Sequence, residues 1–318
     1  MANLRAIRTR IRSVENTRQI TKSMKMVAAA KLRKTQTAFA NLRVYADRSG
    51  DILKQLGGLT AKGSAEDGNG SPAAGSASSR EADGLTPQGA DRWIVPRLEI
   101  RTVCYVLMVG NRGLCGTYNQ ALLRYCENII NSSERQNYVI SCGRWGKDLI
   151  ASAGIRVCET VEISDTPTRE EAMELAGKLK TLYSEGTVDE IVFVYQHYRT
   201  VLSQEPTHMT LLPIAQPSRQ SPVDSPVSGD IIFEPDRESV LTALLDMYIG
   251  NTVHAVLLEA RCGEHSARMT AMTAAADNTE ELIGELTLEL NHARQAAITT
   301  ELSEIASGAE ALRNTKAE

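Results

Sequence analysis

The sequence is poor in aromatic residues and has no proline near either end. Aromatic side chains make up 4% of the 318 residues, against 42% for hydrophobic residues of all kinds. All ten prolines lie between Pro72 and Pro235. Because proline interrupts the interior of a helix, the sequence predicts a helical segment, an interrupted middle and a second helical segment.

Cysteine and histidine are also few, and they do not cluster. The six cysteines are scattered, without a CxxC pair, and the five histidines form no ligand set. This spacing predicts reduced, unpaired thiols in a reducing compartment. It gives no metal site, no cofactor and no Ser-His-Asp catalytic set. A net charge of −4 gives no general basis for binding nucleic acid, and the absence of 18 consecutive apolar residues speaks against a membrane span.

The C-terminal stretch, residues 267–312, has apolar or small residues three and four apart. This spacing predicts a long helix with a narrow apolar seam that needs a partner. The seam residues are Met269, Met272, Ala276, Thr279, Ile283, Leu286, Leu290 and Ala293. After a slip of one position, the expected seam continues through Ile298, Leu302, Ile305, Ala309 and Leu312.

Residues 2–56 show the same kind of pattern. The expected stripe has two segments, which consist of Leu4, Ile7, Ile11 and Val14, and of Ala28, Leu32, Thr35, Phe39, Leu42, Ala46, Ser49, Leu53 and Leu56. The arginine-rich start also resembles a mitochondrial transit peptide or a helix on a membrane surface. The apolar stripe continues through Ile20, Met24 and Val27, which favours a structural helix.

The two ends carry opposite charge. Residues 1–56 hold 13 Lys and Arg against 3 Asp and Glu, and residues 259–318 hold 5 against 11. A solvated helix face explains either set alone, but the opposite signs favour pairing of the two ends in one antiparallel coiled coil. About 55 helical residues would make a rod of roughly 80 Å at the usual rise per residue.

The middle of the chain divides into two kinds of sequence. In residues 57–93, 22 of 37 positions are Gly, Ser, Ala or Pro, which predicts a flexible insert. Residues 94–235 alternate like an α/β domain with a mostly parallel, Rossmann-like sheet. We expect strands at 103–109, 138–141, 156–163, 190–195, 207–212 and 231–233. We expect one helix that ends near residue 130 and two more at 144–153 and 169–183. Residues 216–229 are an expected loop, and the last helix is expected to begin near Asp236.

Three features of the middle are candidates for chemistry. Gly110, Gly113 and Gly116 follow the first strand, where a phosphate-binding loop would lie, but their G-x-x-G-x-x-G spacing fits a structural turn better than a nucleotide motif. The segment 143–147 is too short for a P-loop and suits a helix start. Cys115, beside Arg112, is interpreted as a small packed residue, with a reactive thiol as the alternative.

Three segments resemble the γ subunit of F-type ATP synthases. They are LRAIRTRIRSVENTRQITKSMKMVAAAKLRK near the start, VGNRGLCGTYN in the middle, and EHSARMTAMTAAADNTEELIGEL with ARQAAITTELSEIASGAEAL near the end. The resemblance implies a non-catalytic shaft, one copy per complex, inside a hexamer of α and β subunits. It also implies an α/β foot against the ε subunit and the membrane c ring. Because the start is interpreted as a structural helix and not as a transit peptide, we expect a bacterial protein at the cytoplasmic face of the membrane.

The resemblance also implies roles for individual residues. Met24 matches a position close to an acidic β-subunit loop, and Lys22, Lys25, Lys31, Arg33 and Lys34 make the neighbouring shaft positive. Arg294, Gln295 and Thr299 match residues that hydrogen-bond β loops. Arg268, with Met269 and Met272, belongs to the packing between the shaft helices. Arg112, Gly113 and Cys115 form the foot motif, and Phe233 and Glu234 align with the ε and c-ring side.

Two features depart from the family pattern. The 57–93 insert is longer than the connection in many relatives, and it contains no cysteine. Asn111 stands where the motif commonly has Asp, so an ion pair made by that carboxylate in relatives is absent here. The expected architecture is an N-terminal shaft helix (1–56), the insert (57–93), an α/β foot (94–235) and a C-terminal shaft helix (236–318). A nucleotide-binding α/β enzyme with coiled-coil arms and a non-rotary scaffold are the alternative functions.

Overall fold

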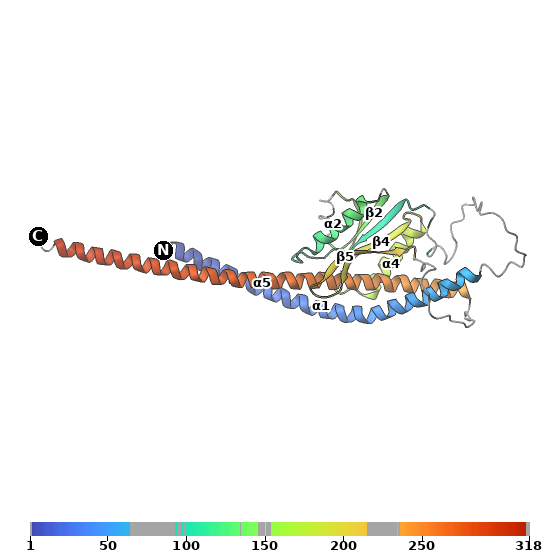
Figure 1. Ribbon diagram of the computed structural model, residues 1–318, viewed down its shortest axis with the longest axis horizontal. Coiled ribbons are helices and arrows are strands. Elements are labelled where there is room, and N and C mark those ends of the chain that lie inside the picture. The colour runs from blue at the N-terminus through green and yellow to red at the C-terminus, as the bar shows by residue number, and fades with distance from the viewer. Residues whose placement is uncertain are drawn as a thin grey trace, which may run out of the picture. The chain divides into compact units, whose positions relative to one another are not determined.

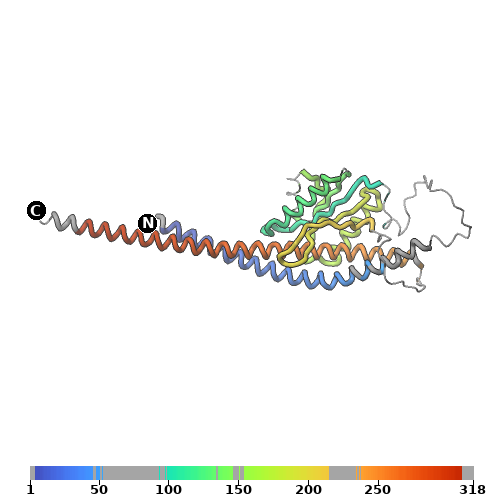
Figure 2. The backbone as a smooth tube through the Cα atoms, in the orientation of Figure 1, coloured from blue at the N-terminus to red at the C-terminus, as the bar shows by residue number. Residues whose placement is uncertain are grey.

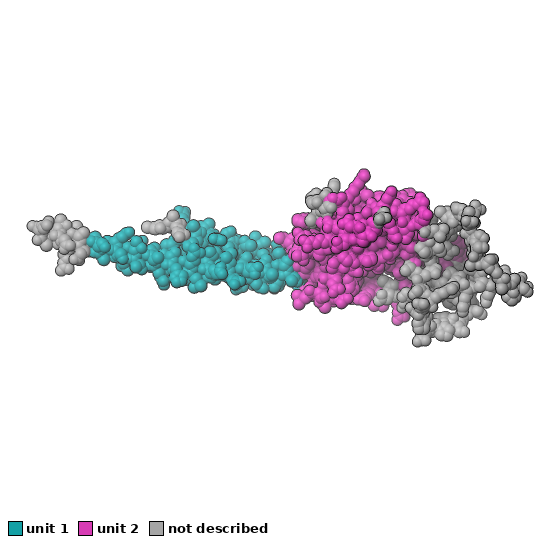
Figure 3. All heavy atoms as spheres, turned by 45° about the horizontal axis from the view of Figure 1, so that its top comes forward, with its two compact units in different colours: residues 1–30, 268–318 teal, residues 31–267 magenta. Residues whose placement is uncertain are grey.

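The computed structural model of the chain describes residues 2–63, 93, 97, 99–133, 135–145, 150, 154–214, 234 and 236–315. It divides into two compact units (Figure 3). The first consists of residues 1–30 and 268–318, and the second of residues 31–267. Two long helices contribute to both units, namely α1 (Ala2–Gly63) and α5 (Arg237–Thr315).

The first unit is a pair of helices. In it α1 and α5 lie side by side and run in opposite directions (Figures 1 and 2). Ile7 and Ala28 of α1 are buried, as are Met272 and Leu286 of α5. The prediction of a paired, antiparallel coiled coil is confirmed.

The predicted seam of α5 is buried only over its first part. All eight residues from Met269 to Ala293 in the predicted seam are buried or half-buried. The predicted continuation is wrong, because Ile298, Leu302 and Ile305 are 49%, 62% and 68% exposed. The physical reason is that α5 extends beyond the start of α1, so this part of α5 does not lie beside α1 (Figure 1). Within the described residues α1 begins at Ala2, and α5 has its last half-buried residue at Ala297.

The buried face of α1 also differs from the prediction in one segment. Ile20, Met24 and Val27 were expected on the buried stripe, but they are 59%, 36% and 54% exposed. The stripe that starts at Leu4 instead reaches buried Thr21 and Ala28, with Lys25 half-buried between them. Steps of three and four from Val14 lead to these positions, so Ile20, Met24 and Val27 form a separate, exposed apolar row.

An ion pair between the described parts of the two helices is exposed and weak. Arg18 and Glu280 form an ion pair across the seam at 3.9 Å, with side chains 42% and 74% exposed. Exposed pairs of this kind contribute about 0–1 kcal/mol. The buried small and aliphatic side chains of the two helices also stabilise their association.

The second unit contains a five-stranded sheet of order β3-β2-β1-β4-β5. The strands are β1 (Thr102–Leu107), β2 (Gln136–Cys142), β3 (Val157–Val161), β4 (Glu190–Tyr198) and β5 (Gln204–Leu212). The pairs β1·β2, β1·β4 and β2·β3 are parallel, and β4·β5 is antiparallel. The predicted mostly parallel sheet is confirmed, with an antiparallel strand at one edge.

Helices cover both faces of the sheet (Figure 1). On one face, α2 (Tyr118–Asn131) packs through Leu122 and Cys126 against β1 and β4. On the other face, α4 (Arg169–Ser184) contributes Leu175 and Leu179 to a core that it shares with the first turns of α5. A sheet buried on both faces explains why β1 reads as an uninterrupted apolar run.

The start of α4 follows from its sequence. Thr168 accepts a hydrogen bond from the backbone N–H of Glu171, whose side chain accepts one from the backbone N–H of Thr168. This capping box satisfies two backbone donors that a helix start leaves open. The predicted cap at Thr168 is confirmed, and α4 ends at Ser184, one residue beyond the predicted end.

Part of α5 has the composition of a membrane-spanning helix. Within Glu238–Ala309 an 18-residue window is apolar enough to cross a membrane, and 44% of it is buried inside the structure. The sequence has no uninterrupted apolar run of that length, so the expectation from such a run missed this window. Leu245, Ile249 and Val253 of α5 are buried in the core of the second unit. Helices buried in a protein core can have the same length and apolar composition. This window is therefore weak support for a membrane span.

Several predicted segments lie outside the described residues. These are the loop at 216–229, the strand at 231–233 and most of the helix at 144–153, of which Ile150 is helical. Most of the insert at 57–93 also lies outside. At its two ends, α1 continues to Gly63, and Trp93 is buried and stacks on Tyr183 with ring centroids 5.7 Å apart.

We expect Gly143→Ala to destabilise the second unit by about 2–4 kcal/mol. Gly143 has φ +136°, and a Cβ there would lie 2.3 Å from the carbonyl oxygen of Val109. Gly154 is the matched control, because it has φ +76° but no atom within 4 Å of a Cβ, so Gly154→Ala should cost only about 1–2 kcal/mol. Urea unfolding of both variants measures the difference, and equal losses would contradict the clash.

Candidate functional site

The glycine-rich loop lies at the point where the strand order reverses. From β1 the chain continues to β2 and β3 on one side, and then returns to β4 on the other. In sheets of this kind, ligands bind outside the carboxyl ends of the two strands at such a point, here β1 and β4. Gly110 to Gly116 follow β1 directly, so this crevice is the first place to examine for a nucleotide.

Helix α5 fills the crevice. A Cβ on Gly263 of α5 would lie 3.3 Å from the ring of Tyr118 and 3.5 Å from Gln196 at the end of β4. A Cβ on Gly110 would lie 3.1 Å from the carboxyl group of Glu264. The space that remains beside Val109 and Arg261 has a volume of about 10 Å³, about enough for one water molecule. The crevice has no room for a nucleotide.

A buried arginine joins α5 to the sheet at this place. Arg261 donates from Nη2 to the carbonyl oxygen of Ile163 at 3.0 Å and from Nη1 to that of Val109 at 3.5 Å. Nη1 also pairs with Glu264, and the side chains of Arg261 and Glu264 are 5% and 1% exposed. A buried charge is tolerated only when it is paired and hydrogen-bonded, and both conditions are met. Arg261 therefore attaches α5 to the segments that follow β1 and β3.

The glycine-rich loop itself is a structural turn, as its spacing indicates. Gly116 has φ +60°, and Leu114 has φ +61° with a side chain that is 59% exposed. The side-chain oxygen of Asn119 accepts the backbone N–H of Gly110 at 2.9 Å. The hydroxyl oxygen of Tyr118 lies 3.1 Å from the carbonyl oxygen of Ala260 of α5 and 3.2 Å from that of Met108, and its one proton is donated between them. These bonds keep the turn against α5.

Five of the six cysteines are buried, and Cys158 is exposed. Cys115 is 3% exposed, and no two of the six cysteines form a disulfide. Burial raises the pKa of Cys126, Cys142 and Cys262 to about 12. A raised pKa leaves no thiolate near neutral pH, and thiolate is the reactive form. The interpretation of Cys115 as a small packed residue is confirmed by its burial.

A carboxylate that the sequence did not single out, Asp165, binds two cations from separate parts of the chain. Its Oδ2 lies 2.5 Å from Nζ of Lys31 on α1 and 3.8 Å from Nη2 of Arg112 in the glycine-rich loop. Burial raises the pKa of Asp165. The hydrogen bond and charge of Lys31, the charge of Arg112 and a hydrogen bond from Asn111 outweigh burial and lower this pKa to about 2.

Asn111 fits this arrangement. Its side-chain NH₂ group donates to the carbonyl oxygen of Ile163 at 2.6 Å, which a carboxylate could not do. An Asp at this position would also place a second negative charge beside Asp165. In this arrangement the carboxylate is that of Asp165, from the segment after β3, and Asn111 contributes hydrogen bonds without a charge.

The residues assigned to β-subunit contact lie on the first unit. Lys22 and Met24 are exposed on α1 and Lys25 is half-buried. Arg294, Gln295 and Thr299 are exposed on α5, where the hydroxyl group of Thr299 donates to the carbonyl oxygen of Gln295 at 2.9 Å. Arg268 and Met269 are half-buried and Met272 is buried. Glu234 is exposed, and Phe233 lies outside the described residues.

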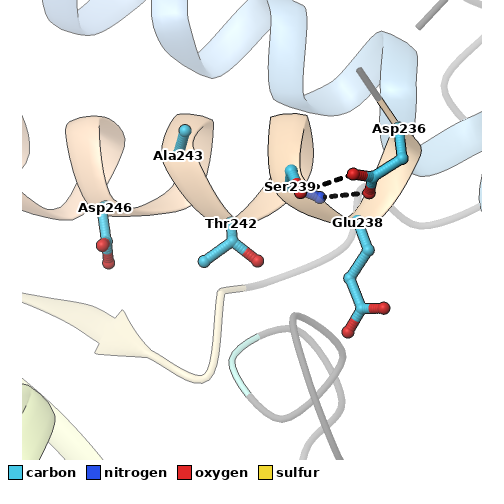
Figure 4. Close-up of a pocket in the computed structure, with 6 residues that line it drawn as sticks. All are labelled: Asp236, Glu238, Ser239, Thr242, Ala243 and Asp246. Carbon is cyan, nitrogen blue, oxygen red and sulfur yellow. Dashed lines mark hydrogen bonds between the residues drawn. The ribbon is translucent and has the colours of Figure 1, made fainter. Parts of the chain in front are cut away.

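An open acidic hollow lies at the start of α5 (Figure 4). It has a volume of about 650 Å³ and is lined by Asp236, Glu238, Ser239, Thr242, Ala243 and Asp246. Asp236 accepts hydrogen bonds from the backbone N–H and the hydroxyl group of Ser239, at 2.9 and 2.6 Å, and Asp246 pairs with Lys180 at 2.8 Å. Among the described residues no three His, Cys, Asp or Glu side chains are placed to bind a metal ion. The hollow is a capped helix start.

The chain is similar to known proteins over almost its whole length. A family model described as ATP synthase matches residues 3–312. The ATP synthase gamma chains of Desulfitobacterium hafniense and Moorella thermoacetica are 39% and 38% identical to this chain, and each match covers 98% of this chain and 100% of the relative.

Solved structures share the fold at lower identity. A chain in the rotational state 3 structure of the Euglena gracilis mitochondrial ATP synthase, which covers OSCP, F1 and the c-ring, has a TM-score of 0.65 at 19% identity. That match covers 99% of this chain and 96% of the other. A chain in the central stalk and c-ring structure from Tetrahymena thermophila has a TM-score of 0.57 at 20% identity, with coverage of 80% and 99%.

We expect Asp165→Asn to destabilise the chain by about 1 kcal/mol at pH 7. The folded-state pKa of Asp165 is lowered to about 2, so the unfolded state takes up the proton first, near pH 3.9. The contribution of Asp165 is therefore fully present above that pH and is lost as the pH falls towards 2. Urea unfolding of both proteins at pH 7 and pH 3 checks this, and a difference that grows in acid would contradict the assignment.

Proposed function

The chain belongs to the family of ATP synthase gamma chains, the non-catalytic subunit of the central stalk, and we propose that it is the shaft that transmits torque between a membrane c ring and a catalytic hexamer of α and β subunits. The shaft consists of 1–56 and 236–318, and the foot of 94–235. The segment 57–93 connects them. This division is by function, and it assigns each long helix mainly to the shaft.

The observation that carries the proposal is the exposed apolar surface of the helix pair. Ile20, Met24 and Val27 form an exposed row on α1, and Ile298, Leu302 and Ile305 form another on α5. Rows of large apolar side chains on a two-helix unit mark a surface that a partner covers. A sleeve of α and β subunits around the helix pair would cover both rows.

Charge supports an acidic partner for α1. Lys22 and Lys25 lie beside Met24, in a segment that holds 13 Lys and Arg against 3 Asp and Glu over residues 1–56. Acidic loops of β subunits would complement this surface. Arg294, Gln295 and Thr299 on α5 present polar groups for hydrogen bonds to other β loops.

An asymmetric surface of this kind can drive a cycle of states without covalent chemistry. A ligand shifts a conformational equilibrium only through its different affinity for the two states. A shaft with different apolar and basic faces contacts each β subunit differently, and rotation presents each face to each subunit in turn. The shaft therefore changes the nucleotide affinity of β subunits while binding no nucleotide itself.

The foot would face the ε subunit and the c ring, through the region of Phe233 and Glu234. Glu234 is exposed, as such a contact requires. One copy of the chain per complex follows from a single shaft in a hexamer. In a bacterial cell this arrangement places the protein at the cytoplasmic face of the membrane, as a peripheral subunit that binds no nucleic acid.

We expect the full chain, expressed with its α and β subunits and purified through a tag on the β subunit, to be recovered in a ratio of one copy to three of each partner. The exposed rows of α1 and α5 supply the contacts. Mass spectrometry of the intact complex measures the ratio. Recovery of an α–β complex that never contains this chain would overturn the proposal.

We expect truncation after Ile298 to leave the chain folded and to weaken coupling. Ile298 to Ala309 are exposed in the described structure, so their removal takes away little burial within the chain. It does remove Leu302 and Ile305 from the apolar row that a partner covers. ATP hydrolysis and ATP-driven proton pumping of the assembled complex are measured together, and pumping equal to that of the full chain would argue against a torque role for this end.

A further inference from the structure

A segment of five residues after β3 is contacted by four side chains of the second unit. We call residues 163–167 the anchor loop. Its backbone carbonyl groups accept from, or lie close to, side chains of Asn111, Arg261, His265 and His254, at 2.6, 3.0, 3.0 and 3.2 Å respectively. Three of these side chains come from α5, and one comes from the glycine-rich loop.

The anchor loop is also fixed to α4. The backbone N–H of Ser164 donates to Oε1 of Glu171 at 3.2 Å, and its hydroxyl group donates to Oε2 at 2.8 Å. The hydroxyl group also lies 2.7 Å from the carbonyl oxygen of Thr166. A loop with this many hydrogen bonds to neighbouring elements has few alternative conformations, so the Asp165 side chain is presented from a fixed position.

Asp165 uses that position to hold α1. Its carboxylate lies 2.5 Å from Nζ of Lys31, and the side chains of Asp165 and Lys31 are 25% and 32% exposed. A second polar link follows on the next turns of α1, where the side chain of Gln36 donates to the hydroxyl group of Tyr198 at 2.6 Å. Between these links, Leu32 and Thr35 are buried. Lys31 and Gln36 therefore hold this part of α1 against sliding or turning.

We propose that the Lys31–Asp165 ion pair is a clasp that fixes α1 to the sheet and α5 while the shaft is under torque, and that Asp165 is a positioning residue for coupling. This inference rests on the shaft function proposed above. It changes the role of Lys31: the side chain is held by an internal carboxylate and is not one of the cations offered to a partner. Arg112 is a secondary partner of the same carboxylate at 3.8 Å.

The test uses the complex assembled from the full chain and compares Lys31→Met with Asp165→Asn. Each variant removes one charge of the pair, and Asp165→Asn leaves Lys31 in place. We expect both variants to retain ATP hydrolysis while the protons pumped per ATP fall about threefold or more, because an ion pair in a network is lost. Lys31→Arg keeps the charge and should pump within about twofold of the wild type.

The matched control is Glu162→Gln. Glu162 pairs with Arg144 at 2.7 Å, and the side chains are 63% and 69% exposed. It removes an ion pair next to the anchor loop without touching α1, so coupling should not change. A loss of coupling in this control equal to that in Asp165→Asn would overturn the clasp. A loss in Lys31→Met without one in Asp165→Asn would also overturn it, and would assign Lys31 to a partner contact.

A second measurement covers variants that do not assemble. Amide hydrogen exchange of the isolated full chain reports on residues 28–36 of α1, and we expect exchange there to rise several-fold in both charge-removing variants, because local opening becomes easier. Unchanged exchange together with unchanged pumping overturns the clasp while the shaft function stands. If the wild-type chain itself fails to support pumping in a complete complex, the proposed function fails as well.

Discussion

The structure depends on the burial of α5. Over its first turns this helix has apolar residues that close one face of the sheet, including Leu245, Ile249 and Val253. Further along, Met272 and Leu286 are buried in the pair with α1. Removing apolar surface from water is the main favourable term in folding. One uninterrupted helix therefore serves as a core element of the second unit and as half of the first.

Close approach of α5 to the sheet also determines what the α/β unit can do. Gly263 and Gly110 have no side chains at the places where the helix meets the strand ends, and Arg261 occupies the position where doubly wound sheets usually admit a ligand. The sheet resembles those of nucleotide-binding enzymes, but here a helix packs where those enzymes bind a ligand. The fold alone did not decide the function, and the side chains at the crevice did.

Much of the fold could be predicted from spacing alone. The three-four pattern from Met269 to Ala293 and the apolar run of β1 each follow from one dominant periodicity. The rows at Ile20, Met24 and Val27, and at Ile298, Leu302 and Ile305, were misassigned for a common physical reason. An apolar row predicts that something covers it, but it does not say whether the cover is the same chain or a partner.

The polar contacts could not be predicted in this way. Asp165 stands in a short turn after β3, and its partner Lys31 is 134 positions away in the sequence. Arg261, Glu264 and Gln36 carry no local pattern either, since each looks like an ordinary polar residue of a helix. Their roles appear only when the anchor loop, the glycine-rich loop and the two long helices are brought together in space.

The glycine at position 263 has a consequence for how this sheet can evolve. Because Gly263 has only a hydrogen as its side chain, α5 lies close to Tyr118 and Gln196. No cofactor could enter this place unless α5 first moved away. Departure of the helix would expose the apolar residues that it buries and would also separate the pair that it forms with α1. An ancestral ligand site, if this sheet once had one, is closed by the close contact of α5 at Gly263.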